Sequence, residues 1–300
     1  MDRAEAEHWI RSYVEPAAPI ELTHDRPWSS VLRVPLARGS AWFKACADLQ
    51  AFEAGITARL AARWPGRVAD VLAHDDERAW LLMADAGTPL AADGNPPDAW
   101  LELLPRYAEL QRGEAAYVDD HLAHAVPDQR PATFVEGYDR LLASPLPIDD
   151  DESTRLRAFA PEFARLADEL SADGIPASVQ HDDLHHKSVY RDDCGPGRVL
   201  DWGDSSISHP FVSLVVTFRF LEEVTGLAPG DRWFSRLRQA YLEPWGDGLE
   251  HALELALRVG AFAHLFTWFR QRERLAREEL AWFDEPFATV LRRALARIPS

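Results

Sequence analysis

The hydrophobic pattern of the sequence changes near residue 84, from one typical of β-strands to one typical of α-helices. Before this point, short strand-forming runs alternate with turns such as Arg26-Pro27-Trp28 and Ala37-Arg38-Gly39. The first three strands should form an antiparallel meander. We therefore expect the region before residue 84 to fold into a small sheet with one helix inserted between its strands. The pattern predicts strands at 20–25, 30–36, 41–46, 68–74 and 79–83, one helix at 49–63 and a short leading helix within 1–16.

Apolar residues recur every three or four positions through most of the remaining chain, which is the helical period. The clearest runs lie at 100–110, 156–170 and 253–268. Pro105 and Pro161 fall inside two of these runs and leave open where those helices end, because proline cannot donate the helical hydrogen bond. We therefore predict an α+β chain with an N-terminal lobe at 1–85, followed at 86–300 by a hinge and a helical lobe.

The bulk composition narrows the class of protein. A chain of 300 residues with 47% hydrophobic residues can bury a substantial core. Its two cysteines, Cys46 and Cys194, fit a reducing cytoplasm better than a disulfide framework. The charged N-terminus does not resemble a signal peptide, and no run approaches 18 apolar residues, so we expect no membrane association.

The net charge of −17 bears on the partners of the chain. It disfavours nucleic acids and anionic lipid surfaces, both of which are negatively charged. It would favour a cationic small molecule, although solubility alone explains an acidic surface equally well. The sequence does not indicate an oligomeric state.

Two aspartates in the stretch QHDDLHHKSVYRDDCGPGRVLDWGD, residues 180–204, carry the strongest functional signal. Asp183 follows His181 by two residues on an expected loop. Asp201 comes 18 residues later, directly after the apolar pair Val199-Leu200 at the end of an expected hairpin. Such a pair suits metal-assisted phosphoryl transfer, in which one carboxylate orients the attacking hydroxyl and the other holds Mg²⁺ on the phosphates.

This stretch resembles the catalytic and metal-binding motifs of the aminoglycoside phosphotransferase-like family, which has a protein-kinase-like fold. The family loop usually reads His-Gly-Asp-x-x-x-x-Asn and is followed by Asp-Trp or Asp-Phe, as in protein kinases. His181, Asp183 and Asp201 match by type and spacing, and Trp202 completes the second motif. The resemblance implies a two-lobed fold with a small antiparallel N-lobe, and an ATP- or GTP-dependent phosphotransferase acting on a hydroxyl of a small molecule.

The resemblance assigns a role to each residue of these two motifs. Asp183 would accept or orient the proton of the substrate hydroxyl, and Asp201 would bridge Mg²⁺ to the phosphates. His181, which we group with Asp183 in the catalytic loop, would hold that loop through hydrogen bonds from its ring to the backbone.

Lysine is rare in this chain, with two lysines among 32 basic residues. Lys44 ends an apolar strand, and Lys187 lies inside the expected catalytic loop. A kinase-like fold would use Lys44 to hold the α- and β-phosphates, with Glu53 on the next helix fixing its position. Arginine would serve poorly there, because the site needs a compact charge on a flexible stem.

The resemblance also predicts how the N-lobe would hold a nucleotide. No glycine precedes Gly39, so a Gly-rich phosphate loop is absent. The first turn carries Ser29 and Ser30, whose hydroxyl and backbone N–H groups could cradle phosphate oxygens instead. The backbone at Met83 and Ala84 would pair with the purine where the last strand enters the hinge.

Two departures from the family pattern bear on activity. Ser188 occupies the place of the metal-binding Asn, and a hydroxyl can bind Mg²⁺ but reaches less far. Lys187, beside it, could neutralise phosphate charge in place of a second metal ion. Ser213 stands where the family often has an aspartate that braces the loop. An impaired, nucleotide-binding pseudokinase is therefore an alternative.

A zinc hydrolase is a more remote alternative, because His181 and His185 have the i, i+4 spacing of a helical zinc motif. That interpretation leaves Lys44, Glu53 and Asp201 without roles.

For the acceptor substrate, the helices after Phe211 offer an acidic pair and aromatic residues that could contact a cationic ligand. These are Glu222, Glu223, Trp233 and Trp268, and each could equally be an ordinary surface or core residue.

Overall fold

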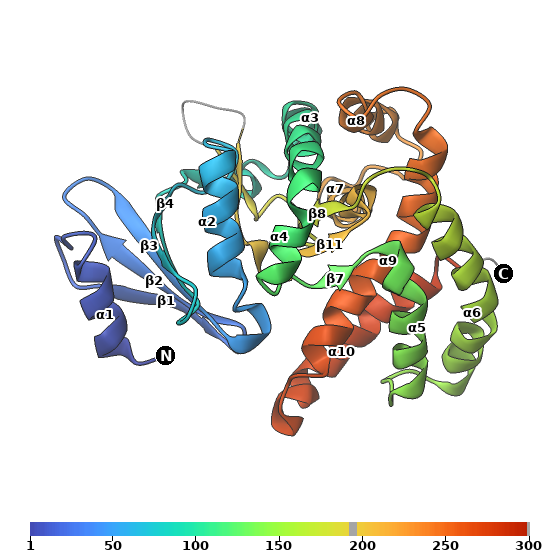
Figure 1. The fold of residues 1–300 in the computed structure, drawn as a ribbon, viewed down its shortest axis with the longest axis horizontal. Coiled ribbons are helices and arrows are strands. Elements are labelled where there is room, and N and C mark those ends of the chain that lie inside the picture. Colours follow the sequence, from blue (N-terminus) through green and yellow to red (C-terminus); the bar gives the residue numbers. More distant parts are fainter. Residues whose placement is uncertain (192–196, 299–300) are drawn as a thin grey trace.

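A computed structural model describes residues 1–191 and 197–298 of the chain. It has two lobes, a β-sheet lobe built by the first part of the sequence and a larger helical lobe built by the remainder (Figure 1). The predicted α+β class and two-lobed fold are therefore confirmed. The N-lobe elements are α1 (Arg3–Arg11), β1 (Glu21–Arg26), β2 (Ser29–Pro35), β3 (Ser40–Cys46), the 3₁₀ turn η1 (Asp48–Gln50), α2 (Glu53–Arg63), β4 (Val71–Asp75) and β5 (Trp80–Ala84).

The five strands form one antiparallel sheet in the order β1-β2-β3-β5-β4. The predicted meander of the first three strands is present, and β5 inserts between β3 and β4. One face of the sheet packs with α1 into a small core that includes Leu32, Phe43 and Trp80. Because side chains alternate along a strand, the neighbours of these residues on β2 and β3 face the opposite side, toward α2 and the helical lobe.

The predicted hinge contains a short strand, β6 (Thr88–Pro89), and a 3₁₀ turn, η2 (Leu90–Asp93). β6 pairs with β9 (Val189–Arg191), which in turn pairs with β10 (Arg198–Val199). The backbone N–H of Ala91 also donates to the carbonyl of His186 at 2.8 Å. The hinge is thereby tied directly to the segment that carries the two predicted motifs.

The helical lobe contains helices that continue through the prolines noted in the sequence. α3 runs from Pro97 to Glu114 across Pro105, and α6 runs from Asp150 to Ser171 across Pro161. One missing hydrogen bond does not end either helix, since each buries an apolar face along its whole length. The remaining helices are α4 (Val118–Ala123), α5 (Phe134–Ala143), α7 (Leu214–Thr225), α8 (Arg232–Leu242), α9 (Glu250–Arg272) and α10 (Arg277–Leu295).

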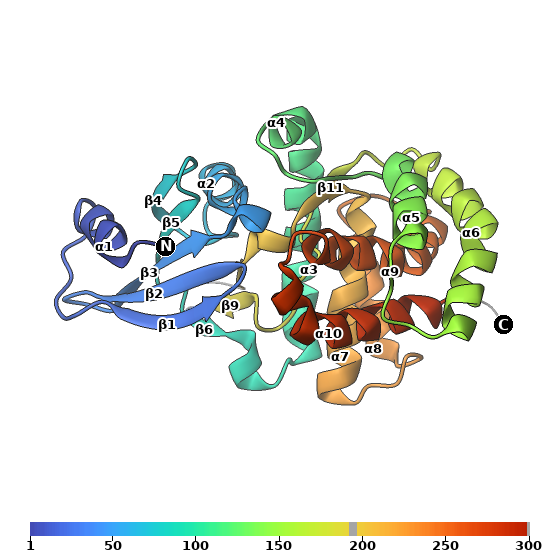
Figure 2. The same ribbon diagram turned by 90° about the horizontal axis from the view of Figure 1, so that it is seen from below.

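α9 lies in the middle of the helical lobe and packs against α5, α6, α7 and α10 (Figure 2). By length and composition alone this helix could cross a membrane, but 78% of its most apolar window is buried inside the protein. Both faces of α9 therefore contribute to the core, which explains why it is hydrophobic nearly all round.

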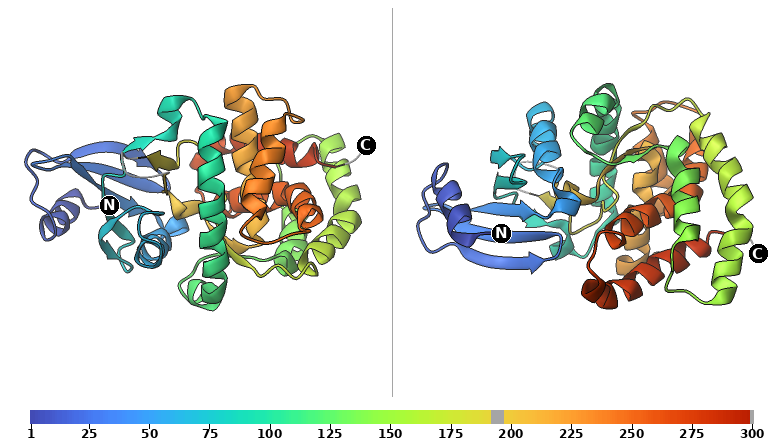
Figure 3. Two further views of the ribbon diagram at one scale, coloured as in Figure 1. Left: turned by 90° about the horizontal axis from the view of Figure 1, so that it is seen from above. Right: turned by 60° about the horizontal axis from the view of Figure 1, so that its bottom comes forward.

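A second small sheet positions the loop that carries Asp183 at the surface of the helical lobe. β11 (Ser206–Ser208) lies between β7 (Asp128–Gln129) and β8 (Ser178–Gln180). Residues 181–188 connect β8 to β9, and Asp201 directly follows Leu200 after β10. These segments, yellow in Figure 3, lie where the two lobes meet. Cys194, one of the two cysteines named above, falls outside the described residues.

Candidate active site

Three charged side chains from distant parts of the chain meet beneath the sheet. The Lys44 Nζ donates to the Glu53 Oε1 at 2.7 Å and also to the Asp201 Oδ1. Lys44 and Glu53 are buried, whereas the Asp201 side chain is 60% exposed because it faces a cavity. The structure thus joins the N-lobe pair expected from the sequence to the aspartate of the second motif.

The local structure explains this meeting. β3 directs Trp42 and Lys44 away from the outer core, and Glu53 is the first residue of α2, which crosses the same face. Burial opposes the charge on Lys44, but the carboxylates of Asp201 and Glu53 outweigh it and raise the pKa of Lys44 well above its usual value. The Lys44 ammonium in turn lowers the pKa of Asp201. The lysine is therefore charged and held between two carboxylates.

A cavity of about 410 Å³ lies between the sheet, the hinge and the β9–β10 hairpin. Its apolar walls include Trp42, Tyr190 and Leu200, and its rim includes the hinge residues 85–87. The alternation that places Trp42 beside Lys44 was visible in the sequence, whereas Tyr190 had no distinguishing signal. The predicted residues that line this cavity are Ser29, Lys44, Glu53, Met83, Ala84, Lys187 and Asp201.

The Ser30 side chain does not line this cavity, and the predicted contact of its backbone N–H group with phosphate stays a prediction. Its hydroxyl donates instead to the Asp25 Oδ1 at 2.6 Å, across the β1–β2 hairpin. Consecutive strand residues face opposite sides, so only one of the two serines can point inward. Ser29 occupies the inward position.

His181 is fixed by the backbone on both sides of its ring. The Nε2–H donates to the carbonyl of Leu200 at 2.8 Å, and the Nδ1 accepts from the backbone N–H of Asp183 at 3.2 Å. Burial lowers the pKa of His181 and favours this neutral form. The ring therefore connects the loop that carries Asp183 to the residue preceding Asp201, and it has no free nitrogen for chemistry.

Asp183 lies on the open side of the catalytic loop with a side chain that is 30% exposed. His185 lies beside it, with the His185 Nε2 3.4 Å from the Asp183 Oδ2. The His185 Nδ1 accepts from the backbone N–H of Lys187 at 3.1 Å, and the ring packs edge-on against Phe220. His185 is thus oriented to donate toward Asp183, a role that the sequence alone did not reveal.

The Ser188 hydroxyl is used inside the loop. It accepts from the backbone N–H of His185 at 2.9 Å and lies 2.9 Å from the carbonyls of Asp183 and His185. Ser188 is buried and does not line the 410 Å³ cavity. Its role as a metal ligand stays a prediction, and this geometry favours a loop-bracing role.

Hydrogen bonds within the helical lobe stabilise the loop that carries Asp183, and Ser213 takes part in them. The Tyr107 hydroxyl accepts from the backbone N–H of His181 at 3.1 Å and lies 3.0 Å from the Ser213 Oγ. The Thr217 hydroxyl donates to the carbonyl of Leu184 at 2.8 Å. The helical periodicity of the sequence indicated only a core position for Tyr107 and did not predict the hydrogen bonds of its hydroxyl group.

Asp182 and Asp201 both adopt the left-handed conformation, with φ of 60° and 67°. Aspartate tolerates this region better than most residues because its side chain can bond locally. The buried Asp182 accepts from the Gln180 side chain at 2.9 Å and lies 3.2 Å from the His264 Nδ1 of α9. This contact between the loop and α9 was not predicted.

The donor atoms present suit magnesium better than zinc. Within residues 1–191 and 197–298, no three His, Cys, Asp or Glu side chains form a group that could hold a metal ion. His181 uses both ring nitrogens for the backbone, which removes the basis of the zinc hypothesis. Mg²⁺ is commonly bound by one or two carboxylates while phosphates and water complete its shell, and the Asp201 carboxylate faces the cavity.

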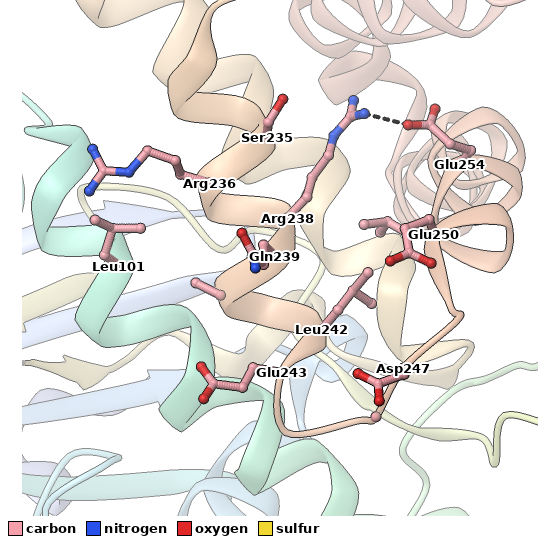
Figure 4. A pocket seen from close by; sticks show the side chains of 13 residues that line it. Leu101, Ser235, Arg236, Arg238, Gln239, Leu242, Glu243, Asp247, Glu250 and Glu254 are labelled. Atoms are coloured by element: carbon pink, nitrogen blue, oxygen red, sulfur yellow. Dashed lines mark hydrogen bonds and ion pairs between the residues drawn. The ribbon is translucent and has the colours of Figure 1, made fainter.

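Three of the proposed acceptor residues have separate partners in the structure. Glu223 pairs with Arg293 at 2.6 Å, and Trp233 stacks with Arg236 at 4.3 Å on α8. Trp268 packs against Phe283, with ring centroids 5.3 Å apart. A groove of about 820 Å³ between α3, α8 and α9 includes Arg236, yet it contains none of the motif residues (Figure 4).

The tip of the β1–β2 hairpin reaches the helical lobe. Trp28, which lines the 410 Å³ cavity, lies with its ring centroid 5.9 Å from that of Trp282 on α10. This aromatic contact joins the lobes at the edge of the cleft.

A scan against protein-family models finds no match for the sequence. A search of the curated proteins also finds none. Solved structures do match over nearly the whole chain. Aminoglycoside 2'-phosphotransferase-IIIa in its GDP complex has 14% identity and a TM-score of 0.65, with 99% of each chain covered.

Two further structures show the same similarity. Macrolide 2'-phosphotransferase from Brachybacterium faecium has 17% identity and a TM-score of 0.63, with 96% of each chain covered. Choline kinase from Streptococcus pneumoniae has 11% identity and a TM-score of 0.63, with 98% of each chain covered. The chain therefore has the two-lobed, protein-kinase-like fold of these proteins, as the sequence motifs predicted.

Proposed function

We propose that this protein is a nucleotide-dependent phosphotransferase that phosphorylates a hydroxyl group of a small molecule. The observation that carries the proposal is the contact of Lys44 with both Glu53 and Asp201 at the wall of the 410 Å³ cavity. These side chains are the ones that phosphoryl transfer in kinase-like folds requires. Structures with this fold include aminoglycoside and macrolide phosphotransferases and choline kinases, which supports the assignment.

The cavity suits a nucleoside triphosphate, either ATP or GTP. Trp42, Tyr190 and Leu200 offer apolar surfaces for a purine, and the backbone from Met83 to Gly87 offers hydrogen-bonding groups at the hinge. Lys44 would neutralise the α- and β-phosphates, and Ser29 and Lys187 would lie near the phosphate end. Bound Mg²⁺ would neutralise charge on the β- and γ-phosphates, and Asp201 would hold it.

Asp183 would act on the acceptor. Its carboxylate would accept a hydrogen bond from the attacking hydroxyl and orient that oxygen toward the γ-phosphate. His185 would keep the Asp183 side chain in place through the contact between the His185 Nε2 and the Asp183 Oδ2. His181 would act indirectly, by fixing the backbone of Asp183 relative to Leu200 and so to Asp201.

For the acceptor we propose a small alcohol, and the net charge of −17 favours a cationic one over an anionic one. The same charge is the reason we propose neither a nucleic acid nor a membrane as partner.

Cys46 is a free thiol beside Glu53, which is compatible with the proposed reducing, cytoplasmic location. The division into lobes at residues 85 and 86 is likewise a proposal.

A nucleotide-binding protein without turnover is the second candidate, and Ser188 is the observation that favours it. Its hydroxyl forms hydrogen bonds within the loop, and a hydroxyl used in this way would not supply a second protein ligand to the metal. In this case ATP and Mg²⁺ would bind without phosphoryl transfer to any alcohol.

Thermal-shift titrations with ATP, GTP, MgCl₂ and ZnCl₂ would be the first test, followed by a screen of candidate alcohols with coupled ADP release. Stabilisation by a nucleotide with Mg²⁺, followed by alcohol-dependent ADP release, supports the phosphotransferase. Binding without release under any alcohol supports the second candidate. Absence of nucleotide stabilisation, or tight stoichiometric zinc, argues against both. Lys44→Ala serves as the binding-deficient control.

A further inference from the structure

Asp204, three residues beyond Asp201, receives hydrogen bonds from both lobes. The Gln50 Nε2 donates to the Asp204 Oδ1 at 2.8 Å, and the Gln271 Nε2 donates to the same oxygen at 2.5 Å. Gln50 belongs to η1, just before α2 in the N-lobe, whereas Gln271 lies near the end of α9 in the helical lobe. One carboxyl oxygen therefore links an N-lobe donor to a donor from the helical lobe.

The neighbouring Gly203 shows how closely these segments pack. A Cβ added at Gly203 would lie 2.7 Å from the Gln50 Cδ and 2.7 Å from the Glu53 Oε2. The turn η5 (Trp202–Asp204) thus touches the start of α2 directly, next to the residue that fixes Lys44. Any shift of Asp204 away from Gln50 would free this end of α2.

The surroundings of Asp204 favour the neutral form of its carboxyl group. Burial raises the pKa of Asp204 to about 8, with further contributions from the nearby Asp183, Asp201 and Asp182, and Arg270 opposes them only in part. Near pH 7 the group is therefore largely a neutral acid. A neutral carboxyl group keeps one carbonyl-like oxygen, which can accept two hydrogen bonds.

We propose that Asp204 is a positioning residue that fastens η1 and α2 to α9 by accepting hydrogen bonds from Gln50 and Gln271. In doing so it holds Glu53 against Lys44, and Lys44 against Asp201. The expected change in kcat rests on the proposed phosphotransferase function. The hydrogen bonds that connect the lobes through Asp204 can be tested without turnover.

The test compares Asp204→Asn with Asp204→Ala. Asparagine keeps an oxygen with two acceptor positions, so Asp204→Asn should stay within about threefold of the parent in kcat and nucleotide Kd. Alanine removes the acceptor, and we expect kcat to fall by about 10- to 100-fold because Glu53 and Lys44 lose their alignment. Gln50→Ala and Gln271→Ala should each reproduce part of this loss, and adding either to Asp204→Ala should cause little further change.

Hydrogen–deuterium exchange gives a readout that does not depend on turnover. Amides of residues 48–63 should exchange faster in Asp204→Ala and Gln50→Ala, and at the parental rate in Asp204→Asn. Gln239→Ala, which removes an exposed glutamine on α8, is the matched control and should change neither kinetics nor exchange. If the protein binds nucleotide but transfers no phosphate, hydrogen–deuterium exchange and the nucleotide Kd still test whether Asp204 connects the two lobes.

Two results would overturn the proposal. If Asp204→Asn is as damaging as Asp204→Ala, the negative charge is required, and Asp204 acts as a metal ligand or base. If Asp204→Ala leaves exchange in residues 48–63 unchanged, the two glutamine contacts do not hold α2.

Discussion

The Lys44 Nζ lies 2.7 Å from the Glu53 Oε1 and also donates to Asp201, which comes 157 residues later. The first contact is local to the N-lobe, since β3 and α2 are consecutive major elements. The second crosses from one lobe to the other. A single ammonium therefore contacts both lobes, and a compact cation is needed at this position in a chain whose basic residues are arginine except for Lys44 and Lys187.

Lys44→Arg should weaken nucleotide binding although the positive charge is kept. The guanidinium is larger and planar, and the buried site between Glu53 and Asp201 accommodates a compact ammonium. We expect the Kd for MgATP to rise about 10-fold or more, measured by isothermal titration calorimetry. Lys187→Arg also changes a lysine that lines the cavity, but its exposed side chain leaves room for a guanidinium, so the Kd should rise less than in Lys44→Arg. Equal losses in the two variants would contradict a specific role for Lys44.

Asp183→Asn should abolish most turnover while leaving nucleotide binding intact. The change keeps the shape of the side chain and removes the charge that orients the acceptor hydroxyl. We expect kcat to fall about 10²-fold or more, within the range for loss of a general base. Nucleotide Kd and melting temperature should stay close to those of the parent, since Asp183 does not line the nucleotide cavity. Turnover within a few-fold of the parent would refute the assignment.

Ser188→Ala distinguishes a bracing role from a metal-binding role. The hydroxyl satisfies the backbone N–H of His185 and lies 2.9 Å from two carbonyls, so its loss should lower the free energy of unfolding by about 1–3 kcal/mol. Urea denaturation measures this effect. The Mg²⁺ concentration for half-maximal nucleotide binding should not change. A large increase in that concentration, with stability unchanged, would instead support Ser188 as a metal ligand.

The sequence predicted the fold well because the N-lobe strands alternate regularly and the turns between them are strongly marked. It also predicted that Lys44, Glu53 and Asp201 would share one cleft, because motif spacing reports chemistry directly. It did not show that the Ser30 side chain bonds to Asp25 rather than lining the cavity, because motif resemblance does not decide which strand face a residue occupies. It did not identify Tyr107 or Gln50, whose roles depend on contacts with residues 74 and 154 positions away. Such contacts leave no local periodicity in the sequence.

Asp204 should make the stability of the unliganded protein fall as the pH rises. Burial and neighbouring carboxylates raise its pKa from 3.8 to about 8, so the folded protein retains a proton that the unfolded chain releases. This stabilising contribution is complete below about pH 3.8 and is lost as the pH rises toward 8. Urea denaturation at pH 5, 7 and 8.5, with EDTA and without nucleotide, should show a steeper decline for the parent than for Asp204→Asn. Identical declines would show that Asp204 titrates normally.

Gly203→Ala should disturb the active site through packing alone. The added Cβ would lie 2.7 Å from both the Gln50 Cδ and the Glu53 Oε2, so one of these side chains must move. Displacing Glu53 would release Lys44, and we expect kcat/KM for nucleotide to fall about 10-fold or more, since misplacement on the order of 1 Å costs this much. Gly230→Ala is the matched control, because a Cβ there meets no atom within 4 Å. Gln50→Ala also removes the hydrogen bond to Asp204, so if crowding against Gln50 dominates, the Gly203→Ala/Gln50→Ala double variant should match Gln50→Ala alone. Activity of the double variant below that of both single variants would place the clash at Glu53.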